Sequence, residues 1–157
     1  EWDKTFGGPD YDIAYSVQQT SDGGYVIAGR FTTSDNGEDD ACLIKTSAEG
    51  DIVWETTFGG DWFDTSHSVQ QTSDGGYILV GGTASFGSGL LDVFLVKVDE
   101  AGDKLWEKTF GGAGDDVGYC VRQTLDGGYV IAGKFEITDG APDDVYVIKT
   151  DAVGNMI

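Results

Sequence analysis

A repeat of 52 residues fills this chain and constrains its fold more than any other feature. Trp2, Trp54 and Trp106 are each followed by an acidic residue, a Lys or Thr, and then Thr-Phe-Gly-Gly. The segment Asp22-Gly-Gly-Tyr25 recurs at the same interval, beginning at Asp74 and at Asp126. Three copies account for the 157 residues. We therefore divide one domain, 1–157, into repeats 1–53, 54–105 and 106–157.

Each repeat contains the pattern of four short β-strands, which the second copy shows most clearly. Its expected strands cover Thr65 to Thr72, Tyr77 to Gly81, Val93 to Val98 and Lys104 to Phe110. The Asp-Gly-Gly segment between the first two predicts a tight turn, because glycine adopts positive φ without steric cost. The second and third strands are almost continuously apolar, which predicts that both of their faces are buried. The sequence therefore predicts an all-β chain.

Four strands in about 50 residues are typical of a β-propeller blade. The segment Val98 to Trp106 (Val-Asp-Glu-Ala-Gly-Asp-Lys-Leu-Trp) resembles the strand–turn–strand signature of quinoprotein-type propellers. The whole repeat resembles those of uncharacterised secreted or surface β-propeller proteins of archaea and bacteria. The resemblance implies a propeller with three four-stranded blades per chain, and it implies no common activity. A β-trefoil, which also has three four-stranded repeats, is the alternative fold.

Three blades do not close a ring of ordinary propeller geometry. The chain begins on a fourth-strand segment, Glu1-Trp2-Asp3-Lys4-Thr5-Phe6, and stops before the next tryptophan is due. We therefore expect an unpaired edge on the last blade, which favours strand addition. A head-to-tail dimer exchanging Glu1 to Phe6 is the favoured assembly, and an open filament is the alternative. A third interpretation is that the chain is part of a longer array.

Composition narrows the choice of partners. The net charge is −19, from 28 acidic and 9 basic residues, so nucleic acid is a poor partner. No apolar stretch approaches the length of a transmembrane helix, and we expect no membrane insertion. Cys42 and Cys120 occupy non-equivalent positions of different repeats, so one disulfide is possible but the spacing does not predict it.

Recurring aspartates are the candidate metal ligands. They occupy two positions of each repeat, in loops expected on one face of a propeller: Asp12, Asp64 and Asp116, and Asp40, Asp92 and Asp144. Carboxylate oxygens are the ligands that calcium prefers, which makes a calcium site conceivable, although no cofactor is predicted. No calcium-loop spacing is present. The favoured interpretation is that these side chains accept hydrogen bonds from nearby backbone N–H groups.

Other recurring residues are interpreted as structural. The tryptophans are expected to pack between blades. Lys45, Lys97 and Lys149 lie inside apolar strands, so each needs a partner, either a carboxylate of the Asp-Gly-Gly turn or a backbone group. His67, the only histidine, stands where the other copies have tyrosine, and we expect it to line a channel or to pack.

Function is the part that the sequence constrains least. No catalytic triad, phosphate loop or Cys/His metal spacing is present, and the chain is predicted not to be an enzyme. Trp62 and Phe63, with Tyr11 as the counterpart of Phe63, are the candidate ligand-binding aromatics. The leading hypothesis is a non-catalytic scaffold acting in self-assembly and protein interaction, extracellular or at the cell surface. A lectin-like or calcium-dependent module, binding a protein or glycan, and a structural filament subunit are the alternatives.

Overall fold

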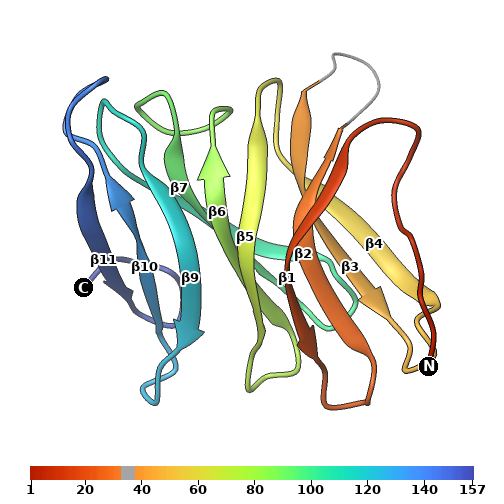
Figure 1. Cartoon of the computed structure of the whole chain (residues 1–157). Helices are drawn as coiled ribbons and strands as arrows, with labels where there is room; N and C mark the ends of the chain where they lie inside the picture. Colours follow the sequence, from red (N-terminus) through yellow and green to blue (C-terminus); the bar gives the residue numbers. More distant parts are fainter. Residues whose placement is uncertain (33–37) are drawn as a thin grey trace.

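The computed structural model describes residues 1–32 and 38–157, which form eleven antiparallel strands in three sheets (Figure 1). Sheet 1 contains β1 (Asp12–Gln19), β2 (Tyr25–Thr32), β3 (Asp39–Thr46) and β4 (Ile52–Phe58). Sheet 2 contains β5 (Asp64–Gln71), β6 (Tyr77–Thr83), β7 (Asp92–Val98) and β8 (Lys104–Phe110). Sheet 3 contains β9 (Val117–Gln123), β10 (Tyr129–Phe135) and β11 (Asp144–Thr150). The all-β prediction is confirmed.

The expected strands of the second repeat match the observed ones within two residues. The strand expected from Lys104 to Phe110 has the observed bounds of β8. The Asp-Gly-Gly turns join the first two strands of each sheet, and their first glycines have φ of 88°, 89° and 83° at Gly23, Gly75 and Gly127. The sheets are offset from the sequence repeats. Trp54 and Trp106 begin a sequence repeat, but each lies on the last strand of the preceding sheet.

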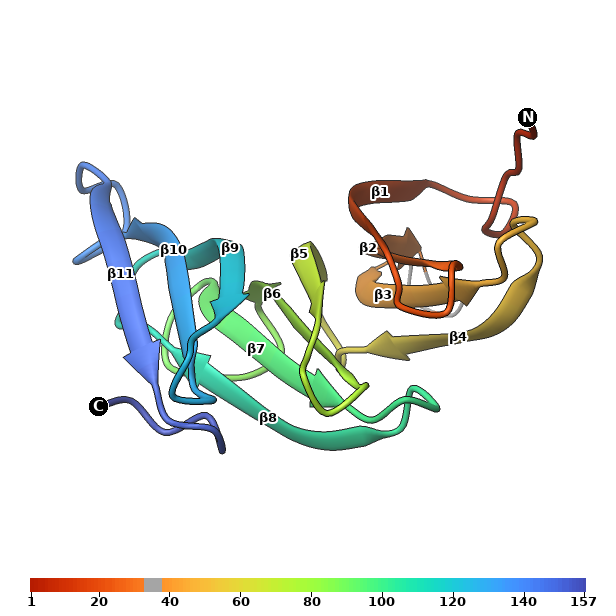
Figure 2. The ribbon, with the colours of Figure 1, turned by 90° about the horizontal axis from the view of Figure 1, so that it is seen from below.

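The three sheets lie side by side in chain order, with sheet 2 in the middle (Figure 1). Seen from below, they fan out as an open arc, with β1, β5 and β9 on its inner side (Figure 2). Every residue of β6 and β7 is buried. Sheet 2 is therefore covered on both faces, as its apolar strands predict.

Two hydrophobic clusters join neighbouring sheets. In the first, Val26, Ala28 and Leu43 of sheet 1 pack with residues of sheet 2 such as Val69 and Leu79. The second contains side chains of sheets 2 and 3 at equivalent positions: Ile78, Val80, Val93, Leu95, Val121, Tyr129, Ile131 and Ile148. The repeat thus produces the same seam twice, one between sheets 1 and 2 and one between sheets 2 and 3.

The tryptophan positions are confirmed as packing between sheets. Trp54 of sheet 1 donates from its indole N–H to the Glu100 carbonyl oxygen of sheet 2, at 3.2 Å. Its ring lies edge-on to Tyr77, with the centroids 5.7 Å apart. Trp106 contacts Tyr129 at the next seam, with tilted rings whose centroids are 5.9 Å apart. Each indole therefore ties the outer strand of one sheet to the sheet that follows it.

The pairing of strands differs from that of a β-trefoil. In a trefoil, strands from all three repeats share a closed barrel. Here every named strand in the described part of the chain pairs only within its own sheet, and an isolated bridge between Leu91 and Asp115 connects sheets 2 and 3. The two cysteines are both free.

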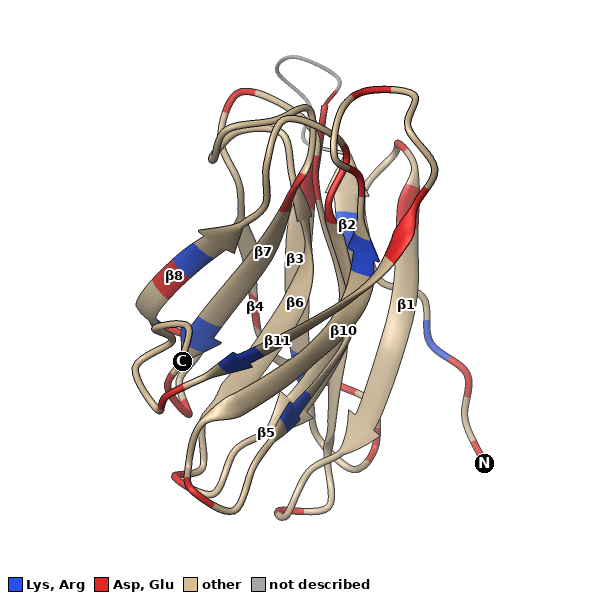
Figure 3. Ribbon diagram, turned by 90° about the vertical axis from the view of Figure 1, so that its left-hand side faces the viewer, with Lys and Arg blue, Asp and Glu red and all other residues tan. Residues whose placement is uncertain are grey.

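Acidic residues are concentrated in the loops and at strand ends, and the middle of β10 and β11 carries few charges (Figure 3). None of the described residues belongs to a helix able to cross a membrane. Negative charge is thus concentrated around the sheets, and the two hydrophobic clusters between them contain no acidic side chain.

Candidate functional site: the open faces of sheets 1 and 3

The recurring lysines have the partners expected from the sequence. Lys45 lies 2.8 Å from Asp22, Lys97 lies 3.1 Å from Asp74, and Lys149 makes the equivalent pair with Asp126. The hydrogen bond from Lys45, aided by those from Thr20 and the Gly24 N–H, holds the pKa of Asp22 well below its ordinary value. These lysines neutralise the turn carboxylates, and this use favours a structural role for them.

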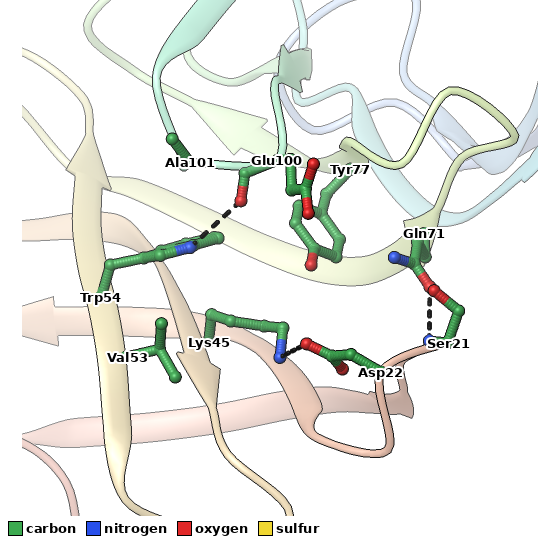
Figure 4. A pocket seen from close by; sticks show the side chains of 9 residues that line it. All are labelled: Ser21, Asp22, Lys45, Val53, Trp54, Gln71, Tyr77, Glu100 and Ala101. Atoms are coloured by element: carbon green, nitrogen blue, oxygen red, sulfur yellow. Dashed lines mark hydrogen bonds and ion pairs between the residues drawn. The ribbon is translucent and has the colours of Figure 1, made fainter.

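The first of these pairs lies in a cavity of about 380 Å³ between sheets 1 and 2 (Figure 4). Trp54 and Tyr77 line one part of it, and the Lys45–Asp22 pair lines another. Figure 4 shows the Lys45 ammonium pointing at Asp22 and the Trp54 indole pointing at Glu100. The polar groups of Lys45 and Trp54 are thus engaged with the protein itself, and we interpret the cavity as part of the seam.

The first set of candidate metal ligands caps the Gly-Gly loops. Asp12 accepts a hydrogen bond from the Gly8 N–H at 2.7 Å, and Asp64 accepts one from the Gly60 N–H at 2.9 Å. Asp116 accepts from the N–H groups of residues 112 and 136. This is the backbone-binding role that the sequence favoured over a metal site.

The second set lies close to the first, pair by pair. The Asp92 carboxylate accepts hydrogen bonds from the N–H groups of residues 88 and 89, at 2.6 and 3.1 Å. Both Asp92 and Asp116 border Gly111, where an added Cβ would fall within 2.5 Å of each carboxylate. Asp40 and Asp64 border Gly59 in the same way, whereas Asp144 is exposed on sheet 3. Among the described residues, no three His, Cys, Asp or Glu side chains are grouped to bind a metal ion.

The candidate aromatics are exposed to different degrees. Tyr11 is 82% exposed and Trp62 is 61% exposed, while Phe63 is half-buried beneath the Arg30 guanidinium, 5.2 Å from its ring centroid. The Trp62 backbone is fixed by Ser85, whose hydroxyl contacts both its N–H and its carbonyl oxygen. No ring contact joins Tyr11, Trp62 and Phe63 in the part of the chain that the structure describes.

His67 lies between two tyrosines on the inner strands. Its ring centroid is 5.1 Å from that of Tyr15 and 5.5 Å from that of Tyr119. The three residues occupy equivalent β-bulges, and Nδ1 of His67 lies 3.2 Å from the Gly118 carbonyl oxygen. Burial lowers the pKa of His67. The packing role expected from the sequence fits these contacts.

The outer face of sheet 3 exposes apolar side chains that are buried at every equivalent position. Val145 is 88% exposed, whereas Val93 and Ala41, at 52-residue intervals before it, are both 0% exposed. Val147 is 63% exposed, and its counterpart Leu95 is 0% exposed. We call this surface, formed by Val130, Ala132, Val145 and Val147, the outer face of sheet 3.

Sheet 1 also has an apolar surface on its side away from sheet 2. Val17 is 65% exposed, whereas its counterparts Val69 and Val121 are 4% and 0% exposed because they pack against the preceding sheet. Ile27 is half-buried here, while the equivalent Leu79 is buried. We call this surface the open face of sheet 1; Tyr25, Cys42 and Ile44 lie on the same face, and Cys42 and Ile44 are already buried in the single chain.

The segment proposed for strand exchange runs along this open face. Residues 1–6 lie outside the strands, and Phe6, Ile27 and Cys42 line a cavity of about 240 Å³ between the segment and sheet 1. Trp2 nevertheless meets sheet 1 as Trp54 meets sheet 2: its ring centroid lies 5.8 Å from that of Tyr25, and its N–H donates to the carbonyl oxygen of residue 48 at 3.2 Å. The segment therefore has the position of an outer strand belonging to a sheet in front of sheet 1.

Sequence reasoning identified the segment but not the two faces. Val93 and Val145 are the same residue type at the same position of the repeat, and only the neighbouring sheet makes one buried and the other exposed. A scan against protein-family models found no match, and a search of curated proteins found no relative.

Proposed function

We propose that this chain is a non-catalytic β-propeller scaffold that self-associates head to tail through the outer face of sheet 3 and the open face of sheet 1. The observation that carries the proposal is the exposure of Val145 and Val147 on one side and of Val17 on the other. At the two internal seams the same positions bury one another. The chain thus contains both halves of a seam that it already forms twice.

The internal seams also predict the register of strand exchange. In sheets 1 and 2, the outer strand places Trp54 opposite Lys45 and Trp106 opposite Lys97. The same pattern places Trp2 of one copy opposite Lys149 of the other, with Phe6 opposite Val145. The pairing of Met156 with Thr150 already matches that of Lys104 with Val98, at the start of the outer strand.

A closed pair is favoured over an open filament. The three sheets fan around β1, β5 and β9 as one arc of a ring (Figure 2). Two such arcs joined by two equivalent seams make a six-bladed ring without an unpaired sheet edge. If the rotation from one copy to the next does not close a ring, the same contacts produce a filament, which is the alternative assembly.

The use of the recurring polar residues supports a scaffold in place of an enzyme. The three lysines are paired with turn aspartates, and the loop aspartates accept backbone N–H groups. Such contacts stabilise the fold, and they occupy the lysine ammonium groups and the aspartate carboxylates. The strongly acidic surface and the resemblance of the repeat support a place outside the cell or at its surface.

A charged residue on the proposed seam tests this function. Val145→Asp places a carboxylate where Val93 is fully buried at the internal seam, and it should abolish association. Leu105→Asp, on the outer strand of sheet 2 and 57% exposed, is the matched control and should associate as the unchanged chain does. Light scattering reports the mass, and circular dichroism verifies that both variants are folded. Equal association of both variants would contradict the proposal.

Ligand binding at the exposed aromatics is the second candidate function. It is favoured by the 61% exposure of Trp62 and the 82% exposure of Tyr11, because exposed aromatic rings stack on sugars and anchor protein partners. A glycan array probed with the unchanged chain and with Trp62→Ala tests it. Signals that depend on Trp62 support a lectin-like module, and an absence of signals on the array counts against it.

A further inference from the structure

The seam between β1 and β5 is closed on its inner side by side chains that accept backbone N–H groups. The Ser16 hydroxyl accepts from the Val69 N–H at 3.3 Å, and the Gln18 carbonyl oxygen accepts from the Gln71 N–H at 2.7 Å. In the opposite direction, the side chain of Gln71 accepts from the Ser21 N–H at 2.9 Å. Three side-chain acceptors therefore connect two strands that share no ladder of backbone hydrogen bonds.

The seam between β5 and β9 repeats these three contacts. Ser68 accepts from the Val121 N–H at 3.3 Å, and Gln70 accepts from the Gln123 N–H at 2.7 Å. Gln123 in turn accepts from the Ser73 N–H at 2.9 Å. The agreement of all three distances between the seams marks these bonds as a regular feature of sheet-to-sheet packing in this chain.

The third repeat changes two of the three acceptors. Cys120 stands where Ser16 and Ser68 stand in the other repeats, and Arg122 stands where they have glutamine. A guanidinium group carries only N–H donors and cannot accept a hydrogen bond, while a thiol is a weak acceptor. Arg122 instead donates to the carbonyl oxygen of its neighbour Val121, at 2.6 Å.

One contact of the pattern is retained at the seam proposed between two copies. Gln19 is the counterpart of Gln71, and its side-chain N–H₂ donates to the Gly23 carbonyl oxygen as that of Gln71 donates to Gly75. The side-chain oxygen of Gln19 therefore has the same orientation, and it can accept from the Leu125 N–H of a second copy.

We infer that Arg122 and Cys120 set the strength of the seam between copies: Arg122 removes one of its three inner hydrogen bonds and Cys120 weakens a second, so that self-association is weaker than the internal packing and adjustable at these two positions. This inference rests on the proposed function and identifies the residues that regulate its interface. The partner is a second copy of this chain. The apolar faces supply the attraction, and the side chains at positions 120 and 122 determine how tightly the inner strands are held.

Restoring an acceptor tests the inference by a gain of affinity. Arg122→Gln introduces the side chain that Gln18 and Gln70 provide at the internal seams. A typical hydrogen bond strengthens an equilibrium about fivefold, and a closed pair has two equivalent seams, so we expect dimerisation about 25-fold tighter. Arg122→Met is the matched control, because it also removes the positive charge but provides no amide oxygen.

Sedimentation equilibrium of the three full-length chains measures the dissociation constants. Tightening by Arg122→Gln and not by Arg122→Met supports the inference, and Cys120→Ser should add a smaller gain through the second acceptor. Equal constants for the Gln and Met variants, in chains that do associate, would overturn it and leave the proposed function intact. If neither the unchanged chain nor any variant associates, the proposed function itself fails.

Discussion

Truncation of Val147 separates the stability of a single chain from the strength of its self-association. Val147→Ala removes two carbon atoms, and their complete burial is worth about 1.6 kcal/mol. Val147 is already 63% exposed, so the single chain should lose only ~0.6 kcal/mol. The remaining ~1 kcal/mol should be lost at the proposed contact between two copies. With two seams per closed pair, we expect dimerisation about 30-fold weaker.

The equivalent Leu95→Ala variant provides the comparison. Leu95 is 0% exposed between sheets 2 and 3, so its truncation leaves a cavity and should lower the free energy of unfolding by about 2 to 5 kcal/mol. For a chain of this size, the melting temperature should fall by roughly 4 to 20 °C. Thermal unfolding at low concentration measures the single chain, and sedimentation equilibrium measures the pair.

The reasoning is refuted if Val147→Ala leaves the dissociation constant unchanged. It is also refuted if Val147→Ala lowers the melting temperature as much as Leu95→Ala does, because the outer face of sheet 3 would then already be covered within one chain.

Three further predictions concern the fold. Asp74→Asn deprives buried Lys97 of its counter-ion and should cost about 1 to 2 kcal/mol at pH 7; burial raises the pKa of Asp74, but hydrogen bonds from Thr72 and Lys97 outweigh it and lower the pKa in the folded state, so this difference should begin to shrink below pH ~4 and should disappear only once the pH falls below the lowered pKa. Burial lowers the pKa of His67, so acidification through pH ~6.5 should destabilise the chain, and His67→Tyr should remove that slope; an unchanged slope in denaturant titrations would assign it elsewhere. Trp54→Ala should cost about 2 to 4 kcal/mol and exposed Trp62→Ala less than ~0.5, and similar losses in the two variants would contradict the seam role of Trp54.

The repeat made the architecture largely predictable. A residue type that recurs at 52-residue intervals indicates a structural role that every repeat shares. The pairing of Lys97 with Asp74 follows from the cost of burying an amine without a partner. The packing of Trp54 between sheets follows from the large apolar area of an indole. Such residues act within one repeat or between adjacent repeats, so their surroundings are encoded locally.

The candidate site was less predictable, because the exposure of a residue such as Val145 depends on whether a neighbouring sheet covers it. Asp64 and Asp116 offered two uses of a carboxylate, and only the positions of the Gly60 and Gly112 N–H groups distinguish them. Arg122 is visible in the sequence as a departure from glutamine. Its meaning depends on the hydrogen bond from the Gln123 N–H to Gln70, which no periodicity reveals.

We propose that two copies of this chain associate through the outer face of sheet 3 and the open face of sheet 1. The most direct test is light scattering of the purified 157-residue chain across a wide concentration range. We expect a species of twice the chain mass of 16.7 kDa, formed reversibly as concentration rises. A mass that grows without limit would show that the seam propagates as a filament and does not close. A mass of one chain at every concentration would contradict the account.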